Sequence, residues 1–170
     1  VLPDGDTIRA ATLSEITARP PEDVDLIVAP RTLRTQVQPL FPELDIVDLT
    51  LIPNEATRVA LASIPTEARV VGYTYFPSFL TIMKAGIMRF APHVSDLSMA
   101  VRGEEGAEAA IAAADVLIYA TGAEYLLDRI RDGQTAFEYR HTPDNQSMRR
   151  DLLPAIEAAR VAQQEKDAVT

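Results

Sequence analysis

The sequence predicts an α/β fold with mostly parallel sheets covered by helices, and three observations support this prediction. Short apolar runs, typical of buried parallel strands, recur along the chain. Segments with apolar residues at helical spacing separate these runs, and proline or glycine turn signals lie between the two kinds of segment. A repeating strand–helix order favours parallel strands with helices packed on their faces.

The pattern predicts each element in turn. Strands are expected at 7–11, 25–30, 46–52, 69–75, 96–102, 115–120 and 135–140, and helices at 13–19, 33–40, 55–63, 78–90, 106–114, 124–130 and 148–164. Thr12 followed by Glu15 has the spacing of a capping box, which predicts that the first helix begins after Thr12. Pro77 stands where the first turn of a helix accepts proline.

Composition excludes several classes of function. The chain of 170 residues carries a net charge of −9, and its basic residues form no cluster beyond Arg149-Arg150, which argues against direct binding to nucleic acid. Cysteine is absent, so disulfides, thiolate nucleophiles and cysteine metal sites are excluded. No apolar run approaches the roughly 20 residues that a membrane-spanning helix needs, so no membrane partner is expected.

Motifs that carry catalysis or hold cofactors are missing. The sequence contains neither a glycine-rich phosphate-binding motif nor a G-x-S-x-G nucleophile elbow. His93 and His141 are the only histidines, and neither has a partner at metal-binding spacing. We therefore expect no catalytic residues, no metal and no cofactor.

Ligands of open α/β sheets bind beyond the carboxyl ends of the strands, and three such ends are polar or tightly turned here. Each also begins a predicted helix, whose free N–H groups attract anions. The residues expected to bind a ligand at these ends are Arg31, Thr32, Tyr73, Thr74, Tyr75, Ser78, Thr121 and Gly122. The alternative is that the hydroxyls only cap helices, that the two tyrosines pack in the core and that Arg31 is solvated.

The segment 137–144 concentrates ionisable side chains in a short strand and the turn after it. Alternation along a strand places Glu138 and Arg140 on one face, and Tyr139 and His141 on the other. Under the functional interpretation, Glu138, Arg140 and His141 line a ligand site. The alternative is an exposed strand with an ion pair between Glu138 and Arg140.

Two blocks of sequence resemble the C-terminal effector domain of bacterial GntR-type transcription regulators. They are 119–124 with 137–144, and 51–54 with 69–75. The strand order is also similar to the periplasmic-binding-protein-type effector domains of LysR-type regulators. A GntR-type regulator reads DNA with an N-terminal winged helix, which this chain does not contain.

The resemblance implies a two-lobed, periplasmic-binding-protein-like (type 2) domain that occupies residues 1–170, with two crossovers between the lobes. Lobe 1 would comprise about 1–54 and 141–170, and lobe 2 about 55–137. The implied function is to sense a small, anionic metabolite in the cleft between the lobes of a cytoplasmic bacterial regulator. DNA would be reached only through the missing domain, no catalysis is expected, and a homodimer is left open.

Two other functions remain as alternatives. An extracytoplasmic solute-binding protein would share the fold, although such proteins are usually longer than this chain. An isomerase or lyase that works without cysteine could use Glu138 and His141.

Overall fold

The computed structural model describes residues 6–169 and shows a mixed α/β protein with mostly parallel sheets. The chain divides into two compact units, which we describe separately. Unit 1 comprises Val1–Leu51 with Pro143–Thr170, and unit 2 comprises Ile52–Thr142. The chain passes from one unit to the other twice, within strand β3 (Leu51–Pro53) and within strand β8 (His141–Pro143), and these two strands pair with each other.

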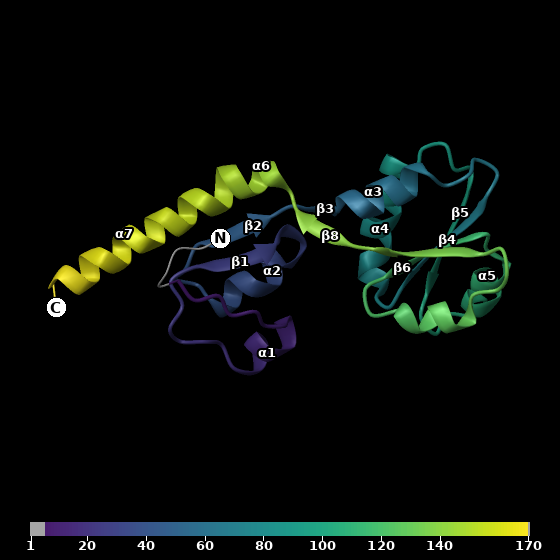
Figure 1. Cartoon of the computed structure of the whole chain (residues 1–170). Helices are drawn as coiled ribbons and strands as arrows, with labels where there is room; N and C mark the ends of the chain where they lie inside the picture. The colour runs from purple at the N-terminus through teal and green to yellow at the C-terminus, as the bar shows by residue number, and fades with distance from the viewer. Residues whose placement is uncertain (1–5, 170) are drawn as a thin grey trace. The chain divides into compact units, whose positions relative to one another are not determined.

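Unit 1 is built on a parallel pair of strands, β1 (Ile27–Pro30) and β2 (Ile46–Leu49) (Figure 1). Between them the chain forms a 3-10 helix (Arg31–Leu33), the short helix α2 (Arg34–Val37) and a second 3-10 helix (Gln38–Leu40). The core of this unit consists of Ala29, Val37, Phe41 and Ile46, and helix α1 (Leu13–Ala18) contributes Leu13 and Ile16 to it.

Unit 2 is a four-stranded, fully parallel sheet in the order β5-β4-β6-β7. The strands are β4 (Arg69–Thr74), β5 (Asp96–Val101), β6 (Val116–Ala120) and β7 (Thr135–Tyr139). Helices α3 (Glu55–Ala62) and α4 (Pro77–Phe90) cover one face. Helix α5 (Ala107–Ala113) and a 3-10 helix (Glu124–Arg129) cover the other face.

Alternation along β4 and β6 explains why both faces of this sheet are packed. Val70 and Ile118 join the core beneath α4, whereas Val71 and Leu117 join the core beneath α5. A parallel strand that is covered on both faces needs apolar residues at successive positions, because these point to opposite faces of the sheet. All four side chains are at most 1% exposed.

A glycine sets how closely α4 approaches β7. A Cβ atom at Gly86 would lie 1.8 Å from the hydroxyl oxygen of Tyr139 and 3.0 Å from its Cζ atom. The buried ring of Tyr139 therefore fits only because residue 86 has no side chain. Burial also raises the pKa of Tyr139 to about 12.

Most predicted elements are confirmed, and the capping box at Thr12 and Glu15 and the proline in the first turn of α4 are present. The strand predicted at 7–11 is wrong: this segment has no regular structure, and Ile8 is 76% exposed with no neighbouring strand to pair with. The helix predicted at 124–130 is a 3-10 helix, and the one at 33–40 is the short α-helix α2 between two 3-10 turns.

The strand predicted at 46–52 is broken at Thr50. The carbonyl of Thr50 accepts a hydrogen bond from the N–H of Asp144 (2.8 Å), and its own N–H donates to Oγ of Ser147 (3.3 Å). These bonds occupy the backbone groups that a continuous strand would use, so β2 ends and β3 begins.

The predicted closing helix is longer than expected and irregular. It comprises α6 (Asn145–Ser147), a π-helical turn (Met148–Leu152) and α7 (Leu153–Val169) (Figure 1). Asp144 caps its beginning by accepting from the N–H of Ser147 (2.9 Å). Pro154 has no N–H to donate four residues back, which accounts for the widened turn just before it.

Candidate functional site

The strand order of unit 2 contains a topological switch point between β4 and β6. From β4 the chain goes through α4 on one face to β5, and it returns through α5 on the opposite face to β6. From β6 it continues in the opposite direction, to β7. Loops leave the carboxyl ends of β4 and β6 in different directions at such a point, and ligands of α/β sheets bind there.

A tyrosine links the two loops at the switch point. Tyr75, just after β4, donates a hydrogen bond from its hydroxyl to the carbonyl of Gly122, just after β6. The guanidinium carbon of Arg102 lies 5.1 Å from the centre of the Tyr75 ring, and the Arg102 N–H donates to the carbonyl of Thr74 (3.0 Å). The ring of Tyr75 therefore supports a cation at the end of β5.

Two further tyrosines extend this aromatic group. The hydroxyls of Tyr73 and Tyr125 are 2.7 Å apart, and the ring centres of both residues lie 6.1–6.3 Å from that of Tyr75. Burial, followed by the hydrogen bond to Tyr125, raises the pKa of Tyr73 well above its usual value, and burial also raises the pKa of Tyr75. The hydroxyls of Tyr73 and Tyr75 therefore stay neutral at physiological pH and keep their bonds to Tyr125 and Gly122.

A pocket of about 470 Å³ opens beside these rings. This volume lies within the range of roughly 300–1,000 Å³ that is typical of small-molecule sites. The lining combines aromatic, small and charged residues: Tyr73, Arg102, Gly103, Glu104, Ala107, Glu108, Tyr125 and Arg129. The pocket draws on the ends of β4 and β5, the beginning of α5 and the 3-10 helix after β6.

The four charged residues of the lining differ in their partners. Arg129 Nη1 and Glu108 Oε2 form an ion pair of 3.0 Å. Within residues 6–169, Arg102 forms no ion pair, and the carboxylate of Glu104 forms neither an ion pair nor a hydrogen bond. The pocket therefore presents one unpaired cation and one unpaired anion.

Thr121, Glu138 and Arg140 form a second polar group, at the ends of β6 and β7. The hydroxyl of Thr121 donates to Oε1 of Glu138 (2.6 Å), and Nε of Arg140 donates to Oε2 of the same carboxylate (2.5 Å). The ion pair that was the alternative interpretation of this strand is thus present. Gly122, with φ of +93°, donates its N–H to Glu124 Oε1 (3.1 Å) rather than leaving it free.

Three other predicted site residues of unit 2 lie outside the pocket. Thr74 is fully buried, and its hydroxyl oxygen accepts from the N–H of Phe76 (3.3 Å). Ser78 is exposed at the second position of α4 and does not cap that helix, because the N-cap residue is Phe76. The ring of His141 packs edge-on against the rings of Phe79 and Tyr139, with distances between ring centres of 5.2 Å and 4.9 Å. Burial lowers the pKa of His141.

The remaining predicted residues, Arg31 and Thr32, follow β1 in unit 1 and form part of its first 3-10 helix. Both are exposed. The pocket is complete within unit 2 without them. Of the predicted residues, the structure brings Tyr73 into the pocket lining and Tyr75 beside it.

Sequence reasoning missed Arg102, Glu104, Tyr125 and Arg129. A usable signal existed for the first two, because Arg102-Gly103-Glu104 directly follows a predicted strand and is as polar as the three strand ends that were selected. Tyr125 and Arg129 had no such signal, since they lie one helical turn apart in a short helix and resemble an ordinary solvated face.

The described residues do not suggest a metal site or a membrane segment. Within residues 6–169, no three His, Cys, Asp or Glu side chains gather in a way that could hold a metal ion. In the same range, no helix combines the length and the apolar character that crossing a lipid bilayer requires. Comparison with known proteins gives no further identification, because no family model, no curated protein and no solved structure matches this chain.

Proposed function

We propose that this protein binds a small polar metabolite that carries a carboxylate, at the carboxyl ends of β4, β5 and β6 in unit 2, and that it senses this metabolite rather than transforming it. The observation that carries the proposal is the pocket of about 470 Å³ beside the β4–β6 switch point, with Arg102 held over the ring of Tyr75. A guanidinium without a carboxylate partner is well suited to bind an anionic group.

The proposal excludes turnover because the pocket lacks the usual arrangement of a general base and a nucleophile. Its hydroxyls belong to Tyr73 and Tyr125, which hydrogen bond to each other, and the pKa of Tyr73 is raised rather than lowered. A nucleophile would need activation in the opposite direction. His141, the residue favoured for an isomerase or lyase, packs against aromatic rings and is not part of the lining.

The setting we propose is the effector domain of a bacterial GntR-type transcription regulator, as the sequence resemblance implies. In this setting the two units are the lobes of a periplasmic-binding-protein-like domain, but the proposed pocket lies within unit 2 and not in the cleft between the lobes that the resemblance implies. Ligand binding there shifts an equilibrium that an attached DNA-binding domain reads. The coding sequence upstream tests this setting: a winged helix supports the regulator, and a signal peptide supports an extracytoplasmic solute-binding protein.

Isothermal titration of carboxylates, phosphates and amino acids tests the binding function directly. Tyrosine fluorescence gives a second readout, because the chain has no tryptophan and Tyr73, Tyr75 and Tyr125 make up three of its five tyrosines. We expect binding by at least one compound that carries a carboxylate, without chemical change of the compound. If no compound in these classes binds, the proposal is wrong.

A variant that fills the pocket locates the site. Ala107 lines the pocket, so Ala107→Leu should abolish binding, whereas Ala109→Leu on the exposed side of the same helix should not change it. Tyr125→Ala is the second pocket variant should Ala107→Leu unfold, because Tyr125 is 38% exposed and contributes less to the core. If the affinity is unchanged in both pocket variants, the ligand does not bind in this pocket.

A further inference from the structure

The charges of the pocket narrow the class of ligand. Arg129 and Glu108 neutralise each other across 3.0 Å, so they leave little net charge for a ligand to balance. Arg102 and Glu104 have no such partners within residues 6–169, although both line the same pocket. A ligand that is only anionic would satisfy Arg102 but would be repelled by the carboxylate of Glu104.

The backbone and the ring of Tyr75 explain why Arg102 and Glu104 do not pair with each other. The N–H of Arg102 is bonded to the carbonyl of Thr74, and its guanidinium lies over the Tyr75 ring. Tyr75 is itself tied to Gly122. The guanidinium is therefore held in place by aromatic contact, and the carboxylate of Glu104 stays available.

Arg102 and Glu104 are both exposed, so a ligand that enters the pocket can reach either of them. To pair with both, the ligand must carry its own opposite charges close together. Arg102 and Glu104 are separated by one residue, so their Cα atoms can be at most about 7 Å apart. A carboxylate and an ammonium group on the same carbon atom fit this spacing. The rest of the lining, Tyr73, Ala107 and Tyr125, offers apolar surface with two hydroxyls for a side chain.

We infer that the pocket binds a zwitterionic α-amino acid, with Arg102 holding the carboxylate and Glu104 the ammonium group. This inference rests on the proposed function and names its ligand class. It departs from the sequence-based expectation of an anionic metabolite, because Glu104 was not among the residues that the sequence indicated.

The test compares three sets of probes by isothermal titration: the twenty L-amino acids, carboxylic acids of the same side chains without the amino group, and amino acid methyl esters. An amino acid should bind at least tenfold more tightly than either of its counterparts, since hydrogen bonds to charged groups typically contribute this much or more. Equal affinity for the acid that lacks the amino group would overturn the inference while leaving the proposed function intact. Absence of binding by all three sets would overturn both.

Two variants separate the roles of the charged residues. Glu104→Gln should weaken amino acid binding about tenfold or more and leave binding of the acids without the amino group unchanged or stronger. Arg102→Gln should weaken binding of both. The matched control is Glu105→Gln, because Glu105 is exposed on the same loop as Glu104 is, but does not line the pocket. Equal effects of Glu104→Gln and Glu105→Gln would overturn the assignment of the ammonium site.

Discussion

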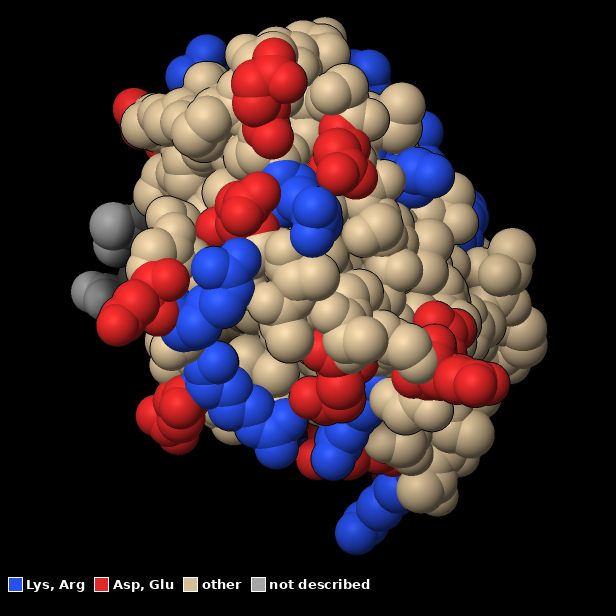
Figure 2. Space-filling view, turned by 90° about the vertical axis from the view of Figure 1, so that its right-hand side faces the viewer, with Lys and Arg blue, Asp and Glu red and all other residues tan. Residues whose placement is uncertain are grey.

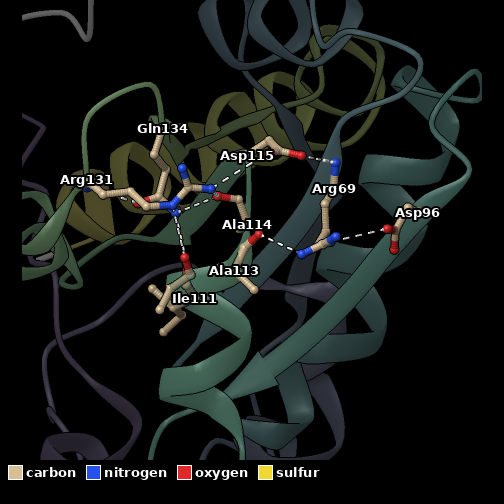
Figure 3. A network of polar contacts seen from close by, with 9 residues as sticks. Arg69, Asp96, Ile111, Ala113, Ala114, Asp115, Arg131 and Gln134 are labelled. Carbon is tan, nitrogen blue, oxygen red and sulfur yellow. Dashed lines mark hydrogen bonds and ion pairs between the residues drawn. The ribbon is translucent and has the colours of Figure 1, made fainter.

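The strands of the unit 2 sheet all begin on one side of the sheet, here called the amino edge, and all end on the opposite side, the carboxyl edge. Charged side chains are bonded differently on these two sides. At the edge formed by the amino ends of the strands, charged side chains are bonded to partners (Figure 3). Asp115 accepts from the backbone N–H of Arg69 (2.9 Å), and the guanidinium of Arg69 reaches both the carbonyl of Ala113 (3.1 Å) and the carboxylate of Asp96 (3.6 Å).

The same edge also completes the end of α5. Gln134 donates to the carbonyls of Ile111 (2.8 Å) and Ala114 (3.0 Å), and Arg131 donates to the carbonyl of Ala114 (2.8 Å) (Figure 3). The last carbonyls of a helix have no partner within it, so these side chains satisfy groups that would otherwise need water. The polar residues at this edge thus hold β4, β6 and α5 together.

At the carboxyl edge, Glu138 is bonded to Thr121 and Arg140 at the ends of β6 and β7. After β5, by contrast, Arg102 rests on an aromatic ring, and Glu104 forms no hydrogen bond or ion pair within the part of the chain that the structure describes. The face in Figure 2 shows basic groups lying beside acidic ones, as surface pairs do. A charged side chain therefore indicates a binding site where a pocket lies beside it and no bonded partner does.

The largest effect is expected from removing the aromatic support of the carboxyl edge. Tyr75→Ala should weaken binding of the tightest amino acid by about tenfold to a hundredfold, because Arg102 loses the ring that positions it. Tyr75→Phe keeps the ring and loses only the bond to Gly122, so it should retain most of the affinity. Isothermal titration measures the affinity of both variants. If Tyr75→Ala binds as tightly as wild type, the ring of Tyr75 does not position Arg102 for binding.

A smaller effect is expected at the amino edge, and on stability rather than binding. Gln134→Ala should lower the free energy of unfolding by about 1 kcal/mol, because the carbonyl of Ile111 keeps only the longer bond from the N–H of Ala114 (3.3 Å) and the carbonyl of Ala114 keeps only Arg131. Urea unfolding measures this loss, and ligand affinity should stay the same. Gln163→Ala, an exposed change in α7, is the control. A loss of ligand affinity in Gln134→Ala would show that the amino edge contributes to binding as well as to stability.

The smallest effect should be a dependence of stability on pH. The N–H of Arg69 is the main cause that holds the pKa of Asp115 below its ordinary value of 3.8 in the folded protein. Asp115 therefore binds a proton more readily in the unfolded chain than in the folded one. Its contribution to stability is present above pH 3.8 and is lost as pH falls through the pKa of the folded state. Urea unfolding at pH 6 and pH 3 should show wild type and Asp115→Asn converging at the lower pH. The control Asp132→Asn should follow wild type at both pH values, since Asp132 is exposed and makes no side-chain bond within residues 6–169.

The strands of unit 2 could be predicted because burial on both faces leaves a continuous apolar run. Val116 to Tyr119 illustrates this, since all four side chains are buried. The strand at 7–11 was wrong because a strand also needs a neighbour, and a single stretch of sequence does not show whether one is present. The break at Thr50 has the same origin, because it depends on Asp144 and Ser147, far along the chain.

The candidate site was predictable in its location but not in its chemistry. The rule that ligands bind at the carboxyl ends of strands led to Tyr73 and Tyr75. It could not show that Thr121 and Arg140 are both bonded to Glu138, or that Glu104 has no hydrogen-bond or ion-pair partner within residues 6–169. Whether a charged side chain is free depends on what folding brings beside it, and spacing in the sequence does not report this.

The contact between Gly86 and Tyr139 has a consequence for sequence variation. With the tyrosine in place, even a methyl group at position 86 would overlap the phenol, so each position restricts the other. Proteins that share this helix and strand should therefore vary at the two sites together, with a larger side chain at 86 accompanied by a smaller one at 139. Such paired exchange would identify distant relatives of unit 2 even after the binding residues have diverged.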